Sequence, residues 1–227
     1  MRTLITIASC YEKEITGINH SYHAVFKKTS FSNPDDEKRF NHFFQQNQAI
    51  FARQLFNGFI PFDCSSLKGQ ITLFPAQKGL KEIDFLRICP RKAGIWVALS
   101  EKAWCILAKF NLPPTHRIPV RVDGFAQQYY LIGFPMITTD AIDFTPSEFI
   151  HISSREIVCY DNHHAYENRA DLFDIAPSKI VIRGYGYDVL NMATLYELSV
   201  APEIIKEFTA HGCVGITKRN AVLVVHE

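Results

Sequence analysis

The sequence lacks the short patterns by which common catalytic and metal sites are recognised. None of its 227 residues falls in a CxxC pair, an HExxH segment or a GxSxG turn. Zinc sites with the usual ligand spacing and hydrolases with a nucleophile elbow are therefore not indicated. The six cysteines are scattered along the chain, which favours reduced thiols over a disulfide framework.

An excess of charge of either sign is also missing. The chain has 24 Lys and Arg against 23 Asp and Glu, a formal net charge of +1. Proteins that bind nucleic acids usually carry a basic surplus, because phosphate contacts drive their affinity, so no nucleic-acid partner is expected. No apolar stretch approaches the ~18 residues of a membrane helix. The first apolar run is interrupted by Thr3, Thr6 and Ser9, which predicts a strand rather than a signal peptide. We expect a soluble, cytoplasmic protein with no membrane partner.

Aromatic residues, by contrast, are plentiful. The sequence contains 18 Phe, 9 Tyr and 2 Trp, and 47% of its residues are hydrophobic. A chain of this length and composition can bury a large core without a disulfide or a metal. We accordingly expect no cofactor.

The N-terminal third predicts one strand and one helix. Residues 2–10 read as a strand. Asn33 is a good helix cap, Pro34 suits the first helical position, and the acidic residues after it favour the positive end of the helix dipole. Phenylalanines then recur at helical spacing, which predicts an amphipathic helix that ends near residues 57–58 and buries its Phe stripe.

From residue 84 onward, one order of elements occurs twice. A strand at 95–99 is followed by a helix capped by Ser100 and by a hairpin that turns at Asp123-Gly124. A strand at 193–198 is followed by a helix that Ser199 is expected to cap, and by two strands that pair across residues 218–220. An internal repeat is one explanation. The other, that unrelated α+β segments share this local order, is favoured because the two segments have little sequence identity.

These elements predict an α+β fold. Short strands joined by hairpins, with few helices, indicate a mainly antiparallel sheet with helices packed on it. We expect residues 84–227 to form the main domain. Residues 1–83 are expected to form an N-terminal region that packs against it.

Residues 84–227 also carry a series of short segments in a recognisable order. They are Asp84-Phe85-Leu86, Val97-Ala98-Leu99-Ser100-Glu101-Lys102, Phe110-Asn111-Leu112-Pro113, Tyr129-Tyr130-Leu131, Ala141-Ile142-Asp143-Phe144, Ser147-Glu148-Phe149, Asp171-Leu172-Phe173, Gly212 and Gly215. In this order and spacing the chain resembles a bacterial family of polymorphic-toxin immunity proteins, long catalogued as a domain of unknown function. The Ile-Asp-Phe and Ser-Glu-Phe segments are the most distinctive.

The resemblance implies a role and a partner. Such proteins bind a toxin made by the same or a neighbouring cell and block it, so a non-catalytic chain with a cognate protein toxin as partner is expected. Inhibitors of basic nucleases are often strongly acidic, because complementary charge speeds encounter. Since this chain is nearly neutral, a nuclease partner is not favoured. The resemblance transfers no binding site.

The alternative is an enzyme or small-molecule-binding protein of another type. His163 and His164 follow Asp161, and such groups can bind a metal or transfer protons. His20 and His23 form an HxxH pair, but on a strand they would point to opposite faces. The segment 184–187 (Gly-Tyr-Gly-Tyr) lacks the third glycine and the lysine of phosphate-binding loops.

Two segments are the predicted partner-binding site: residues 159–170, expected to be an irregular polar loop, and the turn at 184–187. The helices have apolar stripes that must cover the sheet, whereas these segments do not, and loops on a scaffold commonly carry function. Their aromatic and polar composition suits an interface. The predicted site residues are Tyr160, Asp161, His163, His164, Tyr166, Arg169, Tyr185 and Tyr187.

Overall fold

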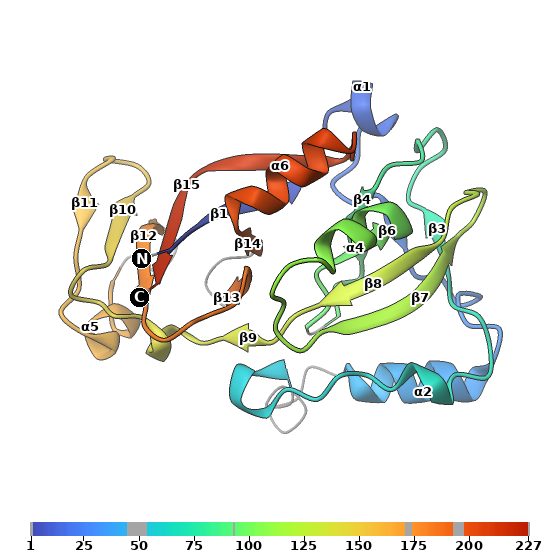
Figure 1. The fold of residues 1–227 in the computed structure, drawn as a ribbon, viewed down its shortest axis with the longest axis horizontal. Helices are drawn as coiled ribbons and strands as arrows, with labels where there is room; N and C mark the ends of the chain where they lie inside the picture. The colour runs from blue at the N-terminus through green and yellow to red at the C-terminus, as the bar shows by residue number, and fades with distance from the viewer. Residues whose placement is uncertain (1, 45–53, 93, 171–173, 193–197, 227) are drawn as a thin grey trace.

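The computed structural model describes residues 2–44, 54–92, 94–170, 174–192 and 198–226, and its strands form two sheets (Figure 1). The eight-stranded sheet has the order β11-β10-β12-β15-β1-β14-β13-β9, and the seven-stranded sheet has the order β4-β6-β8-β7-β3-β2-β5. The strands of the first sheet are β1 (Arg2–Ser9), β9 (Met136–Ile137), β10 (Glu148–His151), β11 (Ile157–Val158), β12 (Ile175–Ile182), β13 (Val189–Met192), β14 (Leu198–Val200) and β15 (Ile216–His226). Those of the second are β2 (Ala24–Val25), β3 (Thr72–Pro75), β4 (Phe85–Leu86), β5 (Ile88–Cys89), β6 (Val97–Ser100), β7 (His116–Val122) and β8 (Tyr129–Gly133).

Short helices connect and cover these strands. The α-helices are α1 (Lys13–Thr16), α2 (Pro34–Phe43), α4 (Glu101–Leu107), α5 (His163–Glu167) and α6 (Pro202–Ala210), and the 3₁₀ turns are η2 (Phe56–Gly58), η3 (Cys64–Ser66) and η4 (Thr139–Ala141). Most strand pairs are antiparallel, although β12 runs parallel to β15, and β3 to β7. The predicted α+β class is confirmed.

The two sheets share one topology. The strand order β13-β14-β1-β15-β12-β10 in the first sheet matches β4-β6-β8-β7-β3-β2 in the second, with the same parallel and antiparallel pairings. The helices correspond too, since α5 lies between β10 and β12 along the chain, as α2 lies between β2 and β3. The structural repeat is therefore real, and the preference for coincidence is wrong. One unit runs from β1 to β7 and the other from β8 to β15.

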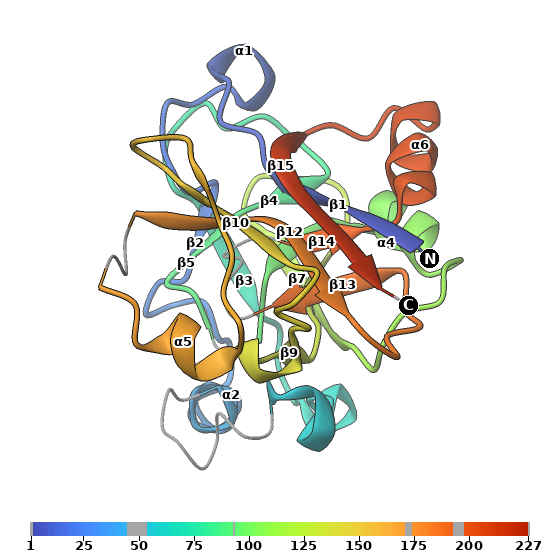
Figure 2. The same cartoon turned by 90° about the vertical axis from the view of Figure 1, so that its left-hand side faces the viewer.

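Each unit gives its first strand to the sheet of the other unit. β1 pairs with β14 and β15, whereas β8 pairs with β6 and β7. Because β1 lies between β14 and β15, and β8 between β6 and β7, neither sheet is continuous without the other unit. Residues 1–83 thus supply strands to both sheets. Figure 2 shows β1 and β15 side by side, where Arg2 is in register with His226.

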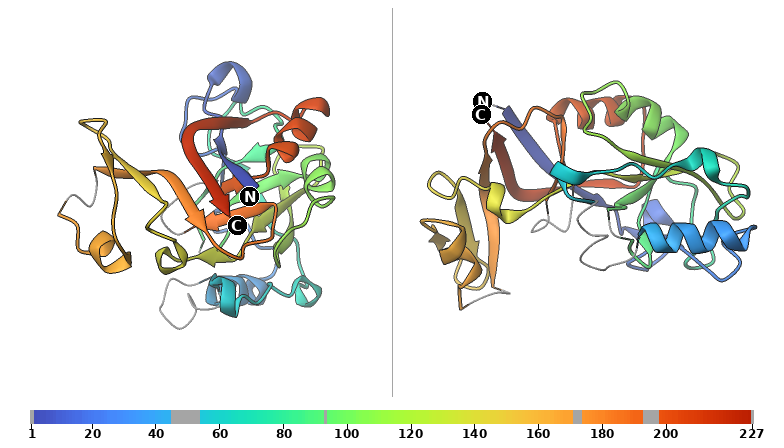
Figure 3. Two further views of the ribbon diagram at one scale, coloured as in Figure 1. Left: turned by 60° about the vertical axis from the view of Figure 1, so that its left-hand side comes forward. Right: turned by 90° about the horizontal axis from the view of Figure 1, so that it is seen from below.

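Two buried aspartates join the units reciprocally. The Asp84 carboxylate accepts the Val214 N–H just after α6 (2.8 Å), and the Asp188 carboxylate accepts the Asn111 N–H just after α4 (2.7 Å). Their backbones repeat the pattern: the Asp84 N–H donates to the Val214 carbonyl, and the Asp188 N–H donates to the Asn111 carbonyl. The aspartates that precede β4 and β13 therefore each hold the segment that follows the other unit's helix. Helices α4 and α6 lie next to each other as a result (Figures 1 and 3).

Several sequence expectations about this region are corrected. Ser100 caps α4 as predicted, with its hydroxyl accepting the Ala103 N–H. Ser199 does not cap α6: it lies in β14, its hydroxyl hydrogen-bonds Thr6, and Ala201 occupies the cap position because Pro202 begins the helix. The stretch 214–225 is not a hairpin, since β15 is one strand paired with β1. Residues 218–223 of β15 form a bulge there, advancing five residues while β1 advances two.

The phenylalanine-rich helix is also shorter than expected. Asn33 caps α2 as predicted, but the helix ends at Phe43, and Leu55 has an extended backbone, so the helix does not continue to residue 57. Phe51 lies outside the described residues. The predicted burial of the stripe is confirmed at Phe40 and Phe44, which belong to a core on one face of the seven-stranded sheet. A second, larger core lies between the two sheets and includes α4 and α6.

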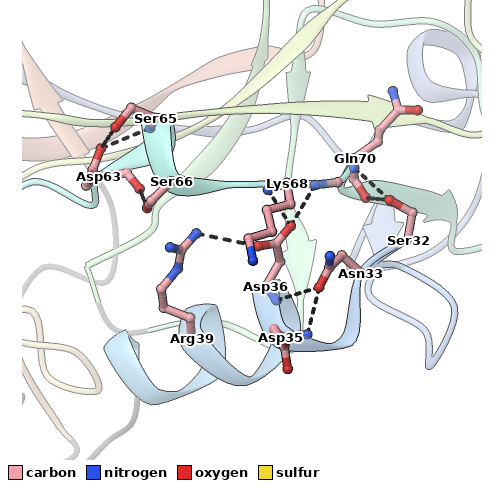
Figure 4. Close-up of polar contacts among 11 residues, drawn as sticks. Ser32, Asn33, Asp35, Asp36, Arg39, Asp63, Ser65, Ser66, Lys68 and Gln70 are labelled. Carbon is pink, nitrogen blue, oxygen red and sulfur yellow. Dashed lines mark hydrogen bonds and ion pairs between the residues drawn. The ribbon is translucent and has the colours of Figure 1, made fainter.

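A buried carboxylate fixes α2 in place (Figure 4). The Asp36 carboxylate points out of the helix and accepts the backbone N–H groups of Lys68 (2.9 Å) and Gly69 (2.7 Å). Asn33 accepts the N–H groups of Asp35 and Asp36 at the start of the same helix. Because the capped end is tied to the loop before β3, the Phe face of α2 is held against the sheet.

Candidate partner-binding surface

The predicted loop at 159–170 contains a short helix, α5. Asn162 caps it, with its side-chain oxygen accepting the Ala165 N–H at 2.9 Å. The expectation of an irregular loop is wrong because this local cap was missed. The helix turns Tyr166 inward, where the ring is only 3% exposed and packs against Phe149 (centroids 4.9 Å apart) and Phe144 (5.5 Å). Burial raises the pKa of the Tyr166 hydroxyl. Tyr166 is therefore a core residue and not part of the surface.

The other predicted residues of this segment lie at the surface or half-buried. Asp161 and His164 are exposed, and Tyr160 is half-buried with its ring edge against Phe149. The Arg169 guanidinium lies 3.8 Å from the centre of the Tyr166 ring and donates to the Tyr166 carbonyl at 2.5 Å. Arg169 thus covers the aromatic cluster from outside.

His163 connects α5 to η4. Its Nε2 atom lies 2.9 Å from the Thr139 hydroxyl and 3.6 Å from a Glu167 carboxylate oxygen, and Thr139 in turn donates to Glu167 at 3.2 Å. A hydrolytic triad needs the carboxylate on Nδ1 and the hydroxyl on Nε2. Here both partners are on the same ring nitrogen. The contacts therefore fix the position of α5 and do not form a nucleophilic triad.

The turn at 184–187 buries one of its two tyrosines and leaves the other half-buried. Tyr185 is 5% exposed, and its hydroxyl donates to the Val189 carbonyl, so the expectation that this ring faces a partner is wrong. Burial raises its pKa. Tyr187 is half-buried and lies against Tyr185 (centroids 5.5 Å apart) and Phe56 (6.0 Å). Phe56 is 37% exposed.

An open hollow of about 310 Å³ lies beside this turn. It is bordered by η2, by the segment from β9 to η4, and by the end of β12 with the turn after it. The lining residues are Leu55, Phe56, Asn57, Met136, Ile137, Thr138, Asp140, Ala141, Ile182, Arg183, Gly184 and Tyr185. Figure 2 shows β9 next to the cyan segment that holds η2, with α5 farther to the left. The hollow thus joins parts of both repeat units.

The hollow has an apolar floor and a polar rim. Ile137 and Ile182 are buried in its floor, and Met136 is half-buried. Asp140 and Arg183 are exposed at its rim, and the Arg183 guanidinium is bonded to Asp143 at 2.6 Å. The predicted segment 184–187 borders the hollow directly. The segment 159–170 contributes no lining residue, but α5 contacts Thr139, which lies between two lining residues.

Sequence reasoning missed most of this surface. Phe56 lies in no predicted site, because the phenylalanine spacing predicts a helix that continues through it to residue 57. Asp140 and Met136 are separated from the turn by more than forty residues, so nothing local links them. Arg183 could have been found from the sequence, because it stands just before Gly184, where a strand ends in a turn.

Among the described residues, no group of three or more His, Cys, Asp and Glu side chains could hold a metal ion. Of the HxxH pair, His23 is buried with Nδ1 accepting the Arg87 N–H, whereas His20 is exposed. Of the described helices, none is long and apolar enough to cross a membrane.

Comparison with known proteins identifies no relative. No protein-family model matches the sequence, and neither the curated proteins nor the solved structures give a match.

Proposed function

We propose that this protein is a non-catalytic immunity-type inhibitor that binds and neutralises a cognate bacterial protein toxin. The observation that carries the proposal is the hollow between the two repeat units. An apolar centre with a polar rim is the usual anatomy of a protein–protein interface. The resemblance of residues 84–227 to immunity proteins supports the same role.

The side chains around the hollow suit an anchor from a partner. Phe56 lines the hollow and packs against Tyr187 beside it, and Arg183 stands exposed at the rim. Aromatic residues and arginine carry much of the binding energy at interfaces. An apolar side chain of the toxin would enter the hollow over Met136, while its polar neighbours meet Asp140 and Arg183.

The direct test is co-expression with the product of the adjacent reading frame in a host that this product kills. We expect the wild-type chain to restore growth and to form a complex with that product. Phe56→Ala and Tyr187→Ala should weaken the complex by about thirtyfold or more, since truncating an interface hot spot costs ~2 kcal/mol or more.

A matched control separates binding from folding. Ile157 on β11 is 66% exposed and lies outside the hollow, so Ile157→Ala removes exposed apolar surface of a similar kind. It should leave both rescue and affinity unchanged. If the wild-type chain neither binds the neighbouring product nor rescues the cells, the proposed function fails. If it binds but Phe56→Ala and Tyr187→Ala bind equally well, the hollow is not the site.

A further inference from the structure

A second surface, on the seven-stranded sheet, gathers three side chains of the types that dominate interfaces. Trp104 comes from α4, Arg117 from β7 and Tyr130 from β8. The Arg117 guanidinium carbon lies 5.5 Å from the Trp104 ring centre and 5.2 Å from that of Tyr130. Arg117 is exposed, and both rings are half-buried. Figure 1 shows α4, β8 and β7 next to one another on the side facing the viewer.

The alternation of β7 produces this arrangement. Ile118, Val120 and Val122 are buried in the core, so Arg117, Pro119 and Arg121 all face outward. The register places Pro119 opposite Tyr130 on β8. Arg117 and Arg121, four residues apart on an extended strand, are about 13 Å apart.

Both arginines have guanidinium groups available for an anion. Among the described residues, neither forms an ion pair with an Asp or Glu side chain, whereas Arg183 is bonded to Asp143. The nearby Glu101 carboxylate accepts the Tyr130 hydroxyl at 3.5 Å instead. A guanidinium held between two rings keeps its planar set of N–H donors free, and that set matches a carboxylate with two parallel hydrogen bonds.

An uncharged hollow adjoins the arginines. It measures about 210 Å³ and is lined by Cys64, Leu67, Gly69, Gln70, Pro119, Val120 and Gln128. The Cys64 thiol donates to the Arg117 carbonyl at 3.3 Å, and burial raises the pKa of this thiol to about 11, so it carries no negative charge at neutral pH. The hollow can therefore take a small apolar or neutral side chain beside the two cations.

We infer that this surface binds an extended acidic segment of another protein, with two carboxylates four residues apart. One carboxylate pairs with Arg117 between the two rings, the second pairs with Arg121, and the residue midway between them lies over Pro119. Rings and arginines can also bind single-stranded nucleic acid by stacking. Arg117 and Arg121 are only two cations, in a chain of net charge +1 that lacks the basic surplus of nucleic-acid binders, and this favours carboxylates instead.

The test uses the full chain and a fluorescein-labelled peptide, Gly-Glu-Ser-Leu-Ser-Glu-Gly, in which the glutamates are four residues apart. Fluorescence anisotropy should show saturable binding. The same peptide with Gln in place of both Glu residues should bind at least about tenfold more weakly, because both charge-assisted pairs with the arginines are lost. This comparison needs no variant of the protein.

Three variants and a control place the binding on this surface. Arg117→Gln should weaken binding about tenfold. Arg117→Lys should weaken it less, because the charge stays while the planar fork is lost. Arg121→Gln should also weaken binding. Arg155→Gln, which changes an exposed arginine in the turn between β10 and β11, should have no effect.

Three outcomes would overturn the inference. The first is equal affinity for the Glu and Gln peptides, or no binding of the Glu peptide at about 1 mM, the weak end of the affinity scale. The second is full binding by a folded Arg117→Gln variant. The third is tighter binding of a labelled oligo(dT) with the same dependence on Arg117, which would assign the surface to nucleic acid. None of these results bears on the toxin-binding hollow, which does not include Arg117.

Discussion

At the scale of single residues, His116 shows how burial sets chemistry. Its ring is completely buried and lies among Phe43, Phe44 and Phe59. Nδ1 accepts the Phe62 N–H at 3.0 Å, so Nε2 carries the proton and donates to Gln54 at 2.8 Å. Burial lowers the pKa of His116 to about 3. The residue therefore stays neutral across the physiological range and has a structural role.

The lowered pKa predicts acid sensitivity. Below pH ~6.5 the unfolded chain binds a proton at His116, whereas the folded protein binds it only near pH 3. The contribution of this residue to the free energy of unfolding therefore falls as the pH drops through that window, by about 1.4 kcal/mol per pH unit. Urea unfolding at several pH values should show that the free energy of unfolding falls less steeply with decreasing pH for His116→Gln than for the wild type. The exposed His164→Gln should behave as the wild type, and equal slopes for His116→Gln and wild type would contradict the assignment.

Residue roles could be predicted where they depend on local chemistry. The caps at Asn33 and Ser100 are confirmed because a cap needs only its own helix. The roles of Tyr166 and Tyr185 could not be predicted in this way. Tyr166 is buried by Phe144 and Phe149, which belong to other parts of the chain, and no local pattern reveals that neighbourhood.

At the scale of elements, hairpins with a turn signal were predictable and long-range pairs were not. The β7–β8 hairpin forms around Asp123-Gly124, where Gly124 has a positive φ of 79°. The polar stretch within β15 predicts a turn, so the sequence indicates two strands where the structure has one. Its partner strand, β1, is about two hundred residues away, and no local sequence pattern in either segment indicates that the two strands pair.

The reciprocal aspartate contacts give a prediction at this scale. Asp84→Ala leaves the Val214 N–H and the Ser100 hydroxyl without their acceptor, in a buried place. It should lower the free energy of unfolding by about 2–3 kcal/mol. Asp188→Ala should have a similar effect, because it leaves the Asn111 N–H unpaired. The exposed Asp123→Ala is the control and should change stability by less than about 0.5 kcal/mol. Urea unfolding measures the free energy of unfolding of all three variants. If it falls only slightly in both Asp84→Ala and Asp188→Ala, the contacts of these aspartates are dispensable.

At the scale of the whole molecule, the strand exchange prevents the units from acting separately. Each sheet requires a strand from the other unit, so we expect one cooperative unfolding transition. Fluorescence reports on Trp96 and Trp104, both in the first unit, while circular dichroism reports on the whole chain. The two midpoints should coincide, and Asp188→Ala, a change in the second unit, should shift both equally. Separate transitions would contradict this prediction.

The overall architecture could be predicted only in part. Composition and strand spacing were enough for the α+β class, and the recurring order of elements raised the possibility of a repeat. The exchange of β1 and β8 could not be predicted, because a strand has the same alternation of buried and exposed residues whichever sheet it joins. The hollow between the units forms only when the two units pack together, so it could not be predicted from the sequence either.

The exchanged first strand also has a consequence for biosynthesis. Nearly 190 residues lie between the end of β1 and the start of β14. At translation rates of about 5–20 residues per second, β1 leaves the ribosome roughly 10–40 s before its partners exist. An apolar strand with free edges is prone to pair with other chains during that interval. The amount of correctly folded protein that a cell obtains should therefore depend on the rate of translation and on whether chaperones cover β1 during this interval.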